Sequence, residues 1–176
     1  ANQRTNVFVI DPSFSLSWGG SSIVFVQLEG FFSLLDLASW DYVINLSGYD
    51  YPLQSTLSIH TYVSKFPGKI WINWWEEWEV ESRITRPMFP LKNFAWCEGP
   101  ASAPNRNYEA TMGDRFPKIK HHQWMILSRE FIEHLRVDRD AHDLLAWMEH
   151  TWIPDESYFG MGGRGPSARS TAATGT

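Results

Sequence analysis

Residues 41–54 read DYVINLSGYDYPLQ, and this stretch changes character halfway along. Residues 42–46 are β-branched or apolar apart from Asn45, which is typical of a buried strand. Residues 47–52 are polar, contain a glycine and a proline, and place Asp50 between two tyrosines. Because such a segment does not continue a strand, we predict a strand over 42–46 that runs into a loop.

The segments around this strand alternate between helical and extended patterns. Apolar residues at positions 24, 28, 31, 32, 35 and 38 share one face of a helix predicted over 23–38, with Ser22 as its cap. Ser55 caps a second predicted helix that ends before residue 67. Further strands are predicted over 6–10, 69–75 and 123–127. Further helices are predicted over 129–136, capped by Ser128, and over 140–150.

This order of elements predicts an α/β fold in which helices flank a mostly parallel sheet. In open sheets of that kind, ligands bind outside the carboxyl ends of the strands. The turn that contains Asp50 lies at such an end. Two interpretations stay open: the turn forms part of a binding site, or Asp50 only bonds the backbone of an ordinary strand-to-helix turn.

The composition limits the classes of protein to consider. The chain has 176 residues, enough for one domain with a core. No apolar run approaches the roughly 18 residues of a membrane span. The net charge is -5 and the 15 basic residues are dispersed, which argues against a nucleic-acid partner. Cys97 is the single cysteine, so no intrachain disulfide can form. The ten tryptophans suit either stacking on sugar rings or a tryptophan-rich core.

Two regions lack a regular pattern. We predict one domain over residues 1–160 with an irregular insertion at about 76–120, which is long for a compact domain and therefore indicates function. Residues 161–176 are rich in Gly, Ser, Ala, Thr and Arg, and we predict a disordered low-complexity tail.

A second candidate site is the segment IPDE at residues 153–156. Ile153 precedes a proline and is expected to be extended, whereas Pro154 suits the first position of a helix. Asp155 and Glu156 then fall in the first turn, where the helix dipole favours negative charge. This arrangement suits a carboxylate base, and it also suits an ordinary helix start, which is the more common role of such residues.

Metal-binding patterns are weak. Asp138 and Asp140 form a D-x-D pair that could hold a divalent cation, but the pair lies between two predicted helices, and we interpret Asp140 as a helix cap. His121 and His122 are adjacent and would diverge on a strand. We therefore predict no metal site.

Three segments together resemble one enzyme family. They are residues 41–53 (DYVINLSGYDYPL), 123–132 (QWMILSREFI) and 153–159 (IPDESYF). In order and spacing they are similar to the core-2/I-branching N-acetylglucosaminyltransferases together with the peptide O-xylosyltransferases. The stretches at 6–9 and 18–21 also fit, so the resemblance covers residues 6–159.

The resemblance implies an inverting transfer of xylose or N-acetylglucosamine from a UDP-sugar to a protein Ser/Thr or glycan hydroxyl. It further implies a GT-A-like fold and no required metal or other cofactor. The family's general base corresponds to Glu156, with Asp155 in a supporting role. Asp50, Gln123 and Trp124 match segments that border the donor and acceptor sugars.

Two further residues are expected to be structural. Asn45 is predicted to bond neighbouring backbone, and Arg129 matches an arginine that recurs in the family. The implied partners are a UDP-sugar donor and a glycan or glycoprotein acceptor. Family members are usually Golgi type II membrane proteins, so the resemblance implies the secretory pathway and attachment through an anchor that this chain does not contain.

The chain departs from the family pattern in three places. His121 and His122 stand where a small Gly-Ser pair is usual, which could narrow the pocket. The family's uridine-binding strand would precede Ala1, and the basic residues that neutralise the pyrophosphate would follow Phe159. We therefore expect part of a catalytic domain. The alternatives are a non-catalytic carbohydrate-binding remnant of such an enzyme and a degenerate product without function.

Overall fold

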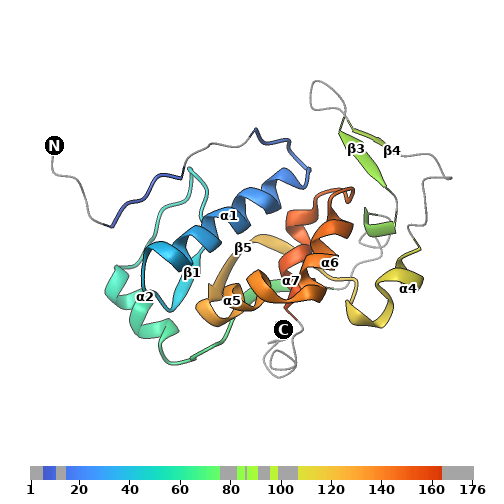
Figure 1. Ribbon diagram of the computed structural model, residues 1–176. Coiled ribbons are helices and arrows are strands. Elements are labelled where there is room, and N and C mark those ends of the chain that lie inside the picture. Colours follow the sequence, from blue (N-terminus) through green and yellow to red (C-terminus); the bar gives the residue numbers. More distant parts are fainter. Residues whose placement is uncertain are drawn as a thin grey trace.

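The structure is a computed structural model of the whole chain, and it describes residues 6–10, 15–75, 83–85, 87–90, 96–98 and 107–163. Its centre is a three-stranded sheet in the order β1–β5–β2, formed by β1 (Tyr42–Ile44), β5 (Lys120–Ser128) and β2 (Trp71–Trp75). A separate pair, β3 (Met88–Pro90) and β4 (Trp96–Glu98), lies apart from this sheet (Figure 1).

The prediction of a mostly parallel sheet is wrong for the described strands. Both neighbouring pairs, β1 with β5 and β2 with β5, are antiparallel. β1 and β2 do run in the same direction and are joined through helix α2 (Thr56–Val63), as the alternating pattern suggests. However, β5 comes from much later in the chain and occupies the position between them, so no two neighbouring strands are parallel.

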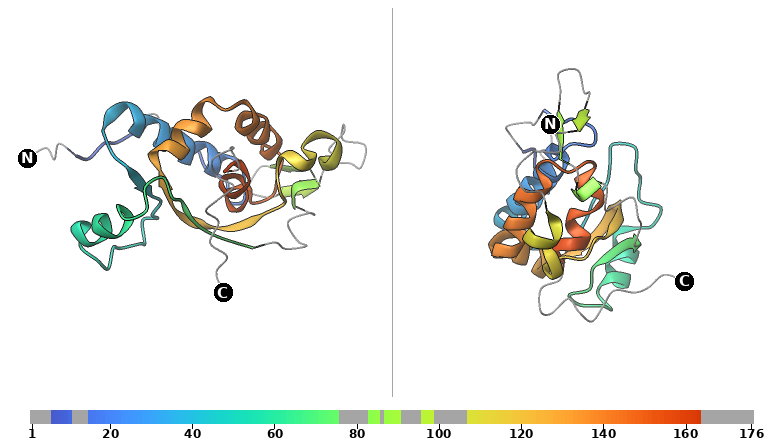
Figure 2. Two further views of the ribbon diagram at one scale, coloured as in Figure 1. Left: turned by 90° about the horizontal axis from the view of Figure 1, so that it is seen from below. Right: turned by 90° about the vertical axis from the view of Figure 1, so that its right-hand side faces the viewer.

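Helices cover one face of the sheet. α1 (Ser22–Leu37), α5 (Arg129–Val137), α6 (Arg139–Met148) and α7 (Tyr158–Gly162) all lie on that side, and Figure 2 shows the sheet curving beneath them. The burial of β5 alternates accordingly, because Met125 and Leu127 are buried against the helices whereas Trp124 is 46% exposed. One face of the sheet is therefore packed, and among the described residues these four helices leave the other face, here called the open face, uncovered.

The predicted helix over 23–38 is confirmed as α1. Its buried residues recur at helical spacing and face the core: Val24, Leu28, Phe31 and Leu35. The predicted cap is wrong, because Ser21 occupies the N-cap position and makes no capping hydrogen bond with its side chain. The Ser22 hydroxyl instead accepts a hydrogen bond from the Ser17 backbone N–H at 3.0 Å.

Two other predicted caps are confirmed by their hydrogen bonds. Ser55 accepts from the backbone N–H of Ser58 at the start of α2, and Ser128 accepts from that of Phe131 at the start of α5. A third is wrong by two residues. Asp138, not Asp140, caps α6 by accepting from the Ala141 N–H at 2.8 Å.

The remaining described elements fall within or after the region predicted to be irregular. α4 (Tyr108–Thr111) and the 3₁₀ turn η2 (Gly113–Arg115) precede β5, which itself begins at Lys120. With β3 and β4, they give regular structure to parts of the predicted insertion; residues 76–82, 86, 91–95 and 99–106 lie outside the described residues. A second 3₁₀ turn, η3 (Pro154–Glu156), joins α6 to α7.

Both ends of the chain differ from prediction. Residues 6–10 do not form a strand, and Val9 is 91% exposed, because no strand of the described sheet pairs with this segment. At the other end, Met161 is fully buried in α7, so structure continues beyond residue 160. The rest of the predicted tail, residues 164–176, lies outside the described residues.

Among the helices of the described ranges, none is both long enough and apolar enough to cross a membrane.

Candidate functional site

The open face of the sheet carries a row of apolar side chains. Ile126 in β5 is the register partner of both Ile44 in β1 and Trp71 in β2. Residues paired across antiparallel strands project to the same face, so these three side chains form a continuous row. Trp124 lies on the same face, two residues before Ile126.

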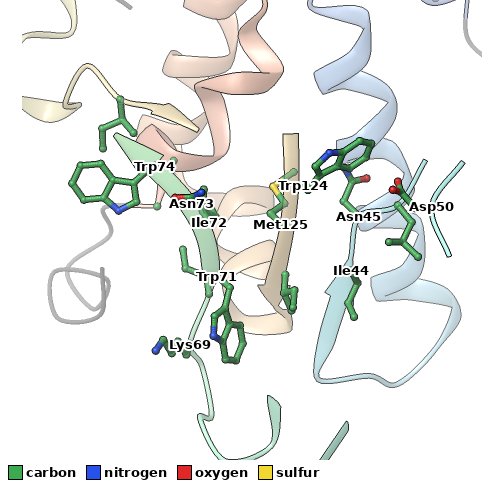
Figure 3. Close-up of a pocket in the computed structure, with 16 residues that line it drawn as sticks. Ile44, Asn45, Asp50, Lys69, Trp71, Ile72, Asn73, Trp74, Trp124 and Met125 are labelled. Carbon is green, nitrogen blue, oxygen red and sulfur yellow. The ribbon is translucent and has the colours of Figure 1, made fainter. Parts of the chain in front are cut away.

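This row lines a pocket of about 540 Å³, within the range of small-molecule sites, together with residues that pack on the helix-covered side, such as Ile72 and Met125. Segments of β1, β2, β5 and the turn after β1 line it (Figure 3). The lining combines indole rings and aliphatic side chains with a small number of polar groups, the latter being Asn45, Asp50, Lys69 and Asn73. Gly160 and Gly163, in and just after α7, close one side.

Asn45 extends the pairing of β1 with β5 beyond the last strand residue. Its backbone N–H donates to the Met125 carbonyl at 3.1 Å, and its side-chain Nδ2 donates to the Gln123 carbonyl at 3.0 Å. The side chain therefore bonds neighbouring backbone, as expected from the sequence. Gln123 contributes its carbonyl to this contact, but it does not line the pocket.

Asp50 holds the turn after β1. Its Oδ2 accepts from the Ser47 backbone N–H at 2.6 Å, and hydrogen bonds from Ser47 lower the pKa of the carboxyl below its ordinary value. Asp50 also lines the pocket, where Figure 3 shows it beyond Asn45. The carboxylate therefore bonds the backbone of the turn and also lines the pocket.

Glu156 lies outside this pocket. Its Oε2 forms an ion pair with Arg83 Nη1 at 3.0 Å and lies 3.9 Å from Lys120 Nζ, with 30% of the side chain exposed. Lys120 begins β5, and Trp124 lies four residues further along, roughly 13 Å at the usual rise per residue of a strand. The carboxylate is therefore held by cations near the start of β5, whereas Trp124 lies at the middle of the strand.

Asp155 is buried next to Glu156. Its side chain is only 5% exposed, and its Oδ1 has no hydrogen-bond partner within the described part of the chain. Burial, with a smaller contribution from the neighbouring Glu156, raises the pKa of this carboxyl to about 6, against the lowering effects of its own backbone N–H and of Arg83. A carboxyl in this position holds a proton at a higher pH than an exposed aspartate does.

The backbone of Ile153, just before η3, is not extended as expected for a residue that precedes a proline. Ile153 was expected to be extended because it precedes Pro154, but its φ of 53° and ψ of 56° place it in the left-handed region. That region is strained for a β-branched residue. The Ile153 N–H donates to the Gly19 carbonyl at 2.9 Å, and Trp152 packs edge-on against Trp18. Contacts with the loop that precedes α1 thus hold the bend that carries Asp155 and Glu156.

The two adjacent histidines diverge as predicted. His122 is exposed, whereas His121 is fully buried beside Phe159, with its ring centroid 6.4 Å from that of the phenylalanine. Burial lowers the pKa of His121 to about 4. Within the described residues, no group of three or more His, Cys, Asp or Glu side chains could hold a metal ion.

Arg129 joins α5 to α1. Its Nη1 and Nη2 donate to the carbonyls of Ala38 and Leu35 at 3.1 Å each, which satisfies groups left open at the end of α1. Its guanidinium also lies 5.3 Å from the ring centroid of Trp40. These contacts are structural, and Arg129 does not line the pocket.

Several residues of the site were missed by the sequence reasoning. The pocket is also lined by Trp71 and Asn73 of β2 and by Lys69, which lies two residues before β2. These three residues alternate along the chain, and this spacing of two is the signal that could have grouped them on one face of the sheet. No sequence pattern indicated that Arg83 and Lys120 lie beside Glu156, because the three residues are far apart in the sequence.

An indole-lined pocket with carboxamide and carboxylate groups on a mixed α/β scaffold is the kind of site that carbohydrate-acting proteins use. Comparison with known families is consistent with that class. The model of the Core-2/I-Branching enzyme family matches residues 1–161, so the chain belongs to this family.

The chain is also similar to individual members of known function. It is 25% identical over 170 residues to beta-1,3-galactosyl-O-glycosyl-glycoprotein beta-1,6-N-acetylglucosaminyltransferase 4 of Danio rerio, covering 92% of this chain and 38% of that protein. It is 26% identical over 172 residues to xylosyltransferase 1 of Canis lupus familiaris, covering 90% and 17%. The xylosyltransferase oxt of Drosophila melanogaster is 24% identical over 163 residues, covering 88% and 18%. The chain thus spans less than two fifths of each relative.

Proposed function

We propose that the protein is an inverting glycosyltransferase with a GT-A-like fold, which moves xylose or N-acetylglucosamine from a UDP-sugar to a protein Ser/Thr or glycan hydroxyl. The observation that carries the proposal is the family match over residues 1–161. The names of the relatives, which include an N-acetylglucosaminyltransferase and xylosyltransferases, support these two sugars.

Glu156 is the proposed general base. In an inverting transfer, the acceptor oxygen attacks the anomeric carbon, the bond from that carbon to the UDP oxygen breaks, and the base takes the acceptor proton. Arg83 and Lys120 hold the Glu156 carboxylate in place, at 3.0 Å and 3.9 Å from its Oε2. For the acceptor hydroxyl to reach Oε2, the bound acceptor must extend from the pocket along β5 towards Lys120.

The pocket is the proposed sugar site. Trp124 offers a partly exposed indole face, and Asn45 and Asp50 offer polar groups for sugar hydroxyls. Gln123 is assigned a backbone role, because its carbonyl fixes Asn45 at the pocket edge. Asp155 is assigned a supporting role, because it is a second, buried carboxyl directly beside the proposed base Glu156. No metal or other cofactor is proposed; the UDP-sugar is a substrate.

The cellular setting follows from the family resemblance alone. We propose the Golgi or another part of the secretory pathway, where UDP-sugar donors and glycoprotein acceptors meet.

A second function is favoured by one observation. Because Glu156 does not line the pocket, the pocket could bind carbohydrate without catalysis. Isothermal calorimetry separates the two functions: the transferase must bind UDP, whereas a carbohydrate-binding protein binds glycans but not UDP. Binding of UDP that is unaffected by Glu156→Gln, together with loss of transfer in that variant, supports the transferase. Glycan binding with no UDP binding contradicts it.

A further inference from the structure

The residues before and within β2 alternate between the two faces of the sheet. Ile70 and Ile72 pack against the hydrophobic core on the helix-covered side. Trp71 is paired in register with Ile126 and therefore faces the open side. Lys69 is two residues from Trp71 and lines the pocket with it. A cationic and an aromatic side chain thus stand next to each other at one end of the pocket.

The ammonium group of Lys69 is held by aromatic rings. Its Nζ lies 5.0 Å from the ring centroid of Phe66 and 5.7 Å from that of Trp71, within the range of cation–π contacts. Phe66 and Trp71 also pack edge-on against each other, with Tyr62 beside both. This packing fixes the position of the charge without neutralising it, because a ring carries no net charge.

No carboxylate in the described part of the chain forms an ion pair with Lys69, in contrast to Arg115, Arg129 and Arg136. Asp50, the acidic residue among those that line the pocket, lies at the far end from Lys69 in Figure 3. Its Oδ2 is already engaged by Ser47. The pocket therefore has a positive end beside Trp71 and a negative, hydrogen-bonding end beside Asn45.

We propose that this pocket binds a sugar ring that carries an acidic group, a carboxylate or a sulfate, with the acidic group at Lys69 and the ring against Trp71. The hydroxyls of the same or a linked sugar then face Asn45 and Asp50. Asp50 enforces the orientation, because an anionic group at that end would meet a like charge. The inference rests on the proposed function only in taking the ligand to be a carbohydrate.

The expected preference is modest because Lys69 is partly exposed. Partly exposed ion pairs contribute up to about 1 kcal/mol, which corresponds to about fivefold in affinity. The preference should also weaken in high salt, since salt screens the interaction between partly exposed charges.

The test measures dissociation constants by ligand-observed NMR titration for three probes: methyl β-D-glucoside, methyl β-D-glucuronide and glucose 6-sulfate. The wild-type chain should bind at least one acidic probe about fivefold more tightly than the neutral glucoside. If only the glucuronide is preferred over the glucoside, the pocket recognises a carboxylate; if only glucose 6-sulfate is preferred, it recognises a sulfate. If both are preferred, it recognises the negative charge of either group.

Three variants isolate the role of Lys69. Lys69→Gln should abolish the preference for acidic probes over the neutral glucoside, and Lys69→Arg should retain it. Lys65→Gln is the matched control, because Lys65 is an exposed lysine four residues away that does not line the pocket. Circular dichroism spectra check that each variant is folded.

Equal affinities for acidic and neutral probes in the wild type, or a preference that survives Lys69→Gln, would overturn the proposal. Failure of every probe to bind would also overturn it. None of these three results bears on the transferase itself, which is tested separately by UDP binding and by Glu156→Gln.

Discussion

The buried carboxyl of Asp155 predicts an unusual dependence of stability on pH. The side chain is 5% exposed in η3, which packs against β5 and α1, and its pKa is raised from 3.8 to about 6, first by burial and then by Glu156, against the effect of Arg83. The folded state therefore binds this proton more tightly than the unfolded chain does. Its contribution to stability is fully present below pH 3.8 and is lost as the pH rises through 6.

The size of the effect follows from the shift in pKa. A rise from 3.8 to about 6 costs the folded state about 3 kcal/mol at pH 7, and much less at pH 4. Asp155→Asn removes this cost while keeping the shape of the side chain. We expect the variant to be more stable than the wild type by about 3 kcal/mol at pH 7 as an upper limit, with the difference falling well below about 1 kcal/mol at pH 4.

His121 acts in the same pH range with the opposite sign. Burial lowers its pKa from 6.5 to about 4, so the unfolded chain binds its proton more tightly, and stability is lost as the pH falls from 6.5 to 4. The two groups should largely cancel in the wild type between these values. In Asp155→Asn, the His121 contribution is no longer opposed by Asp155, and it should raise stability by about 3 kcal/mol from pH 4 to pH 7.

The assay is urea denaturation of both proteins at half-unit steps from pH 4 to pH 7, followed by circular dichroism, with equal denaturant slopes as the control for two-state unfolding. A constant difference between Asp155→Asn and wild type across this range would refute the reasoning. So would a variant that is less stable than wild type at pH 7.

Two further predictions concern residues that shape the site. Asn45→Ala removes the hydrogen bond to the Gln123 carbonyl and should reduce the free energy of unfolding by about 1 kcal/mol in urea denaturation, whereas an unchanged value would show that the contact does not stabilise the strand end. Gly19→Ala places a Cβ 3.2 Å from Trp152 Cζ3 at a φ of +72°, and should cost about 1–2 kcal/mol. Gly48→Ala is the matched control, because a Cβ at this position meets no atom within 4 Å and φ is not positive. It should change the free energy of unfolding by less than about 0.5 kcal/mol. Equal effects of the two substitutions would contradict this account.

The parts of the fold that the sequence predicted depend on local patterns. The inner face of α1 and the caps Ser55 and Ser128 are properties of a few neighbouring residues, and all three are confirmed. The position of β5 between β1 and β2 depends on pairing between distant segments, which alternation along the chain does not encode. The same is true of Ile153, whose left-handed conformation depends on contacts with residues near Gly19.

The candidate site was predictable to a similar extent. The end of β1 was expected to face a ligand, and Asp50 and Trp124 do share a pocket. Glu156 was expected beside them, but it pairs with Arg83 and Lys120 instead, outside the pocket. Lys69 was missed because a lone lysine is uninformative until the packing of Ile70 and Ile72 shows which face it occupies.

The most direct test of the central claim is sugar transfer by the protein with and without the Glu156 carboxylate. UDP release from UDP-xylose and UDP-N-acetylglucosamine is measured in the presence of Ser/Thr peptides or glycan acceptors. Glu149→Gln, which removes an exposed carboxylate after α6, is the control. We predict that Glu156→Gln loses nearly all acceptor-dependent release while still binding UDP, and that Glu149→Gln retains wild-type activity. Acceptor-dependent turnover that persists in Glu156→Gln would contradict the account.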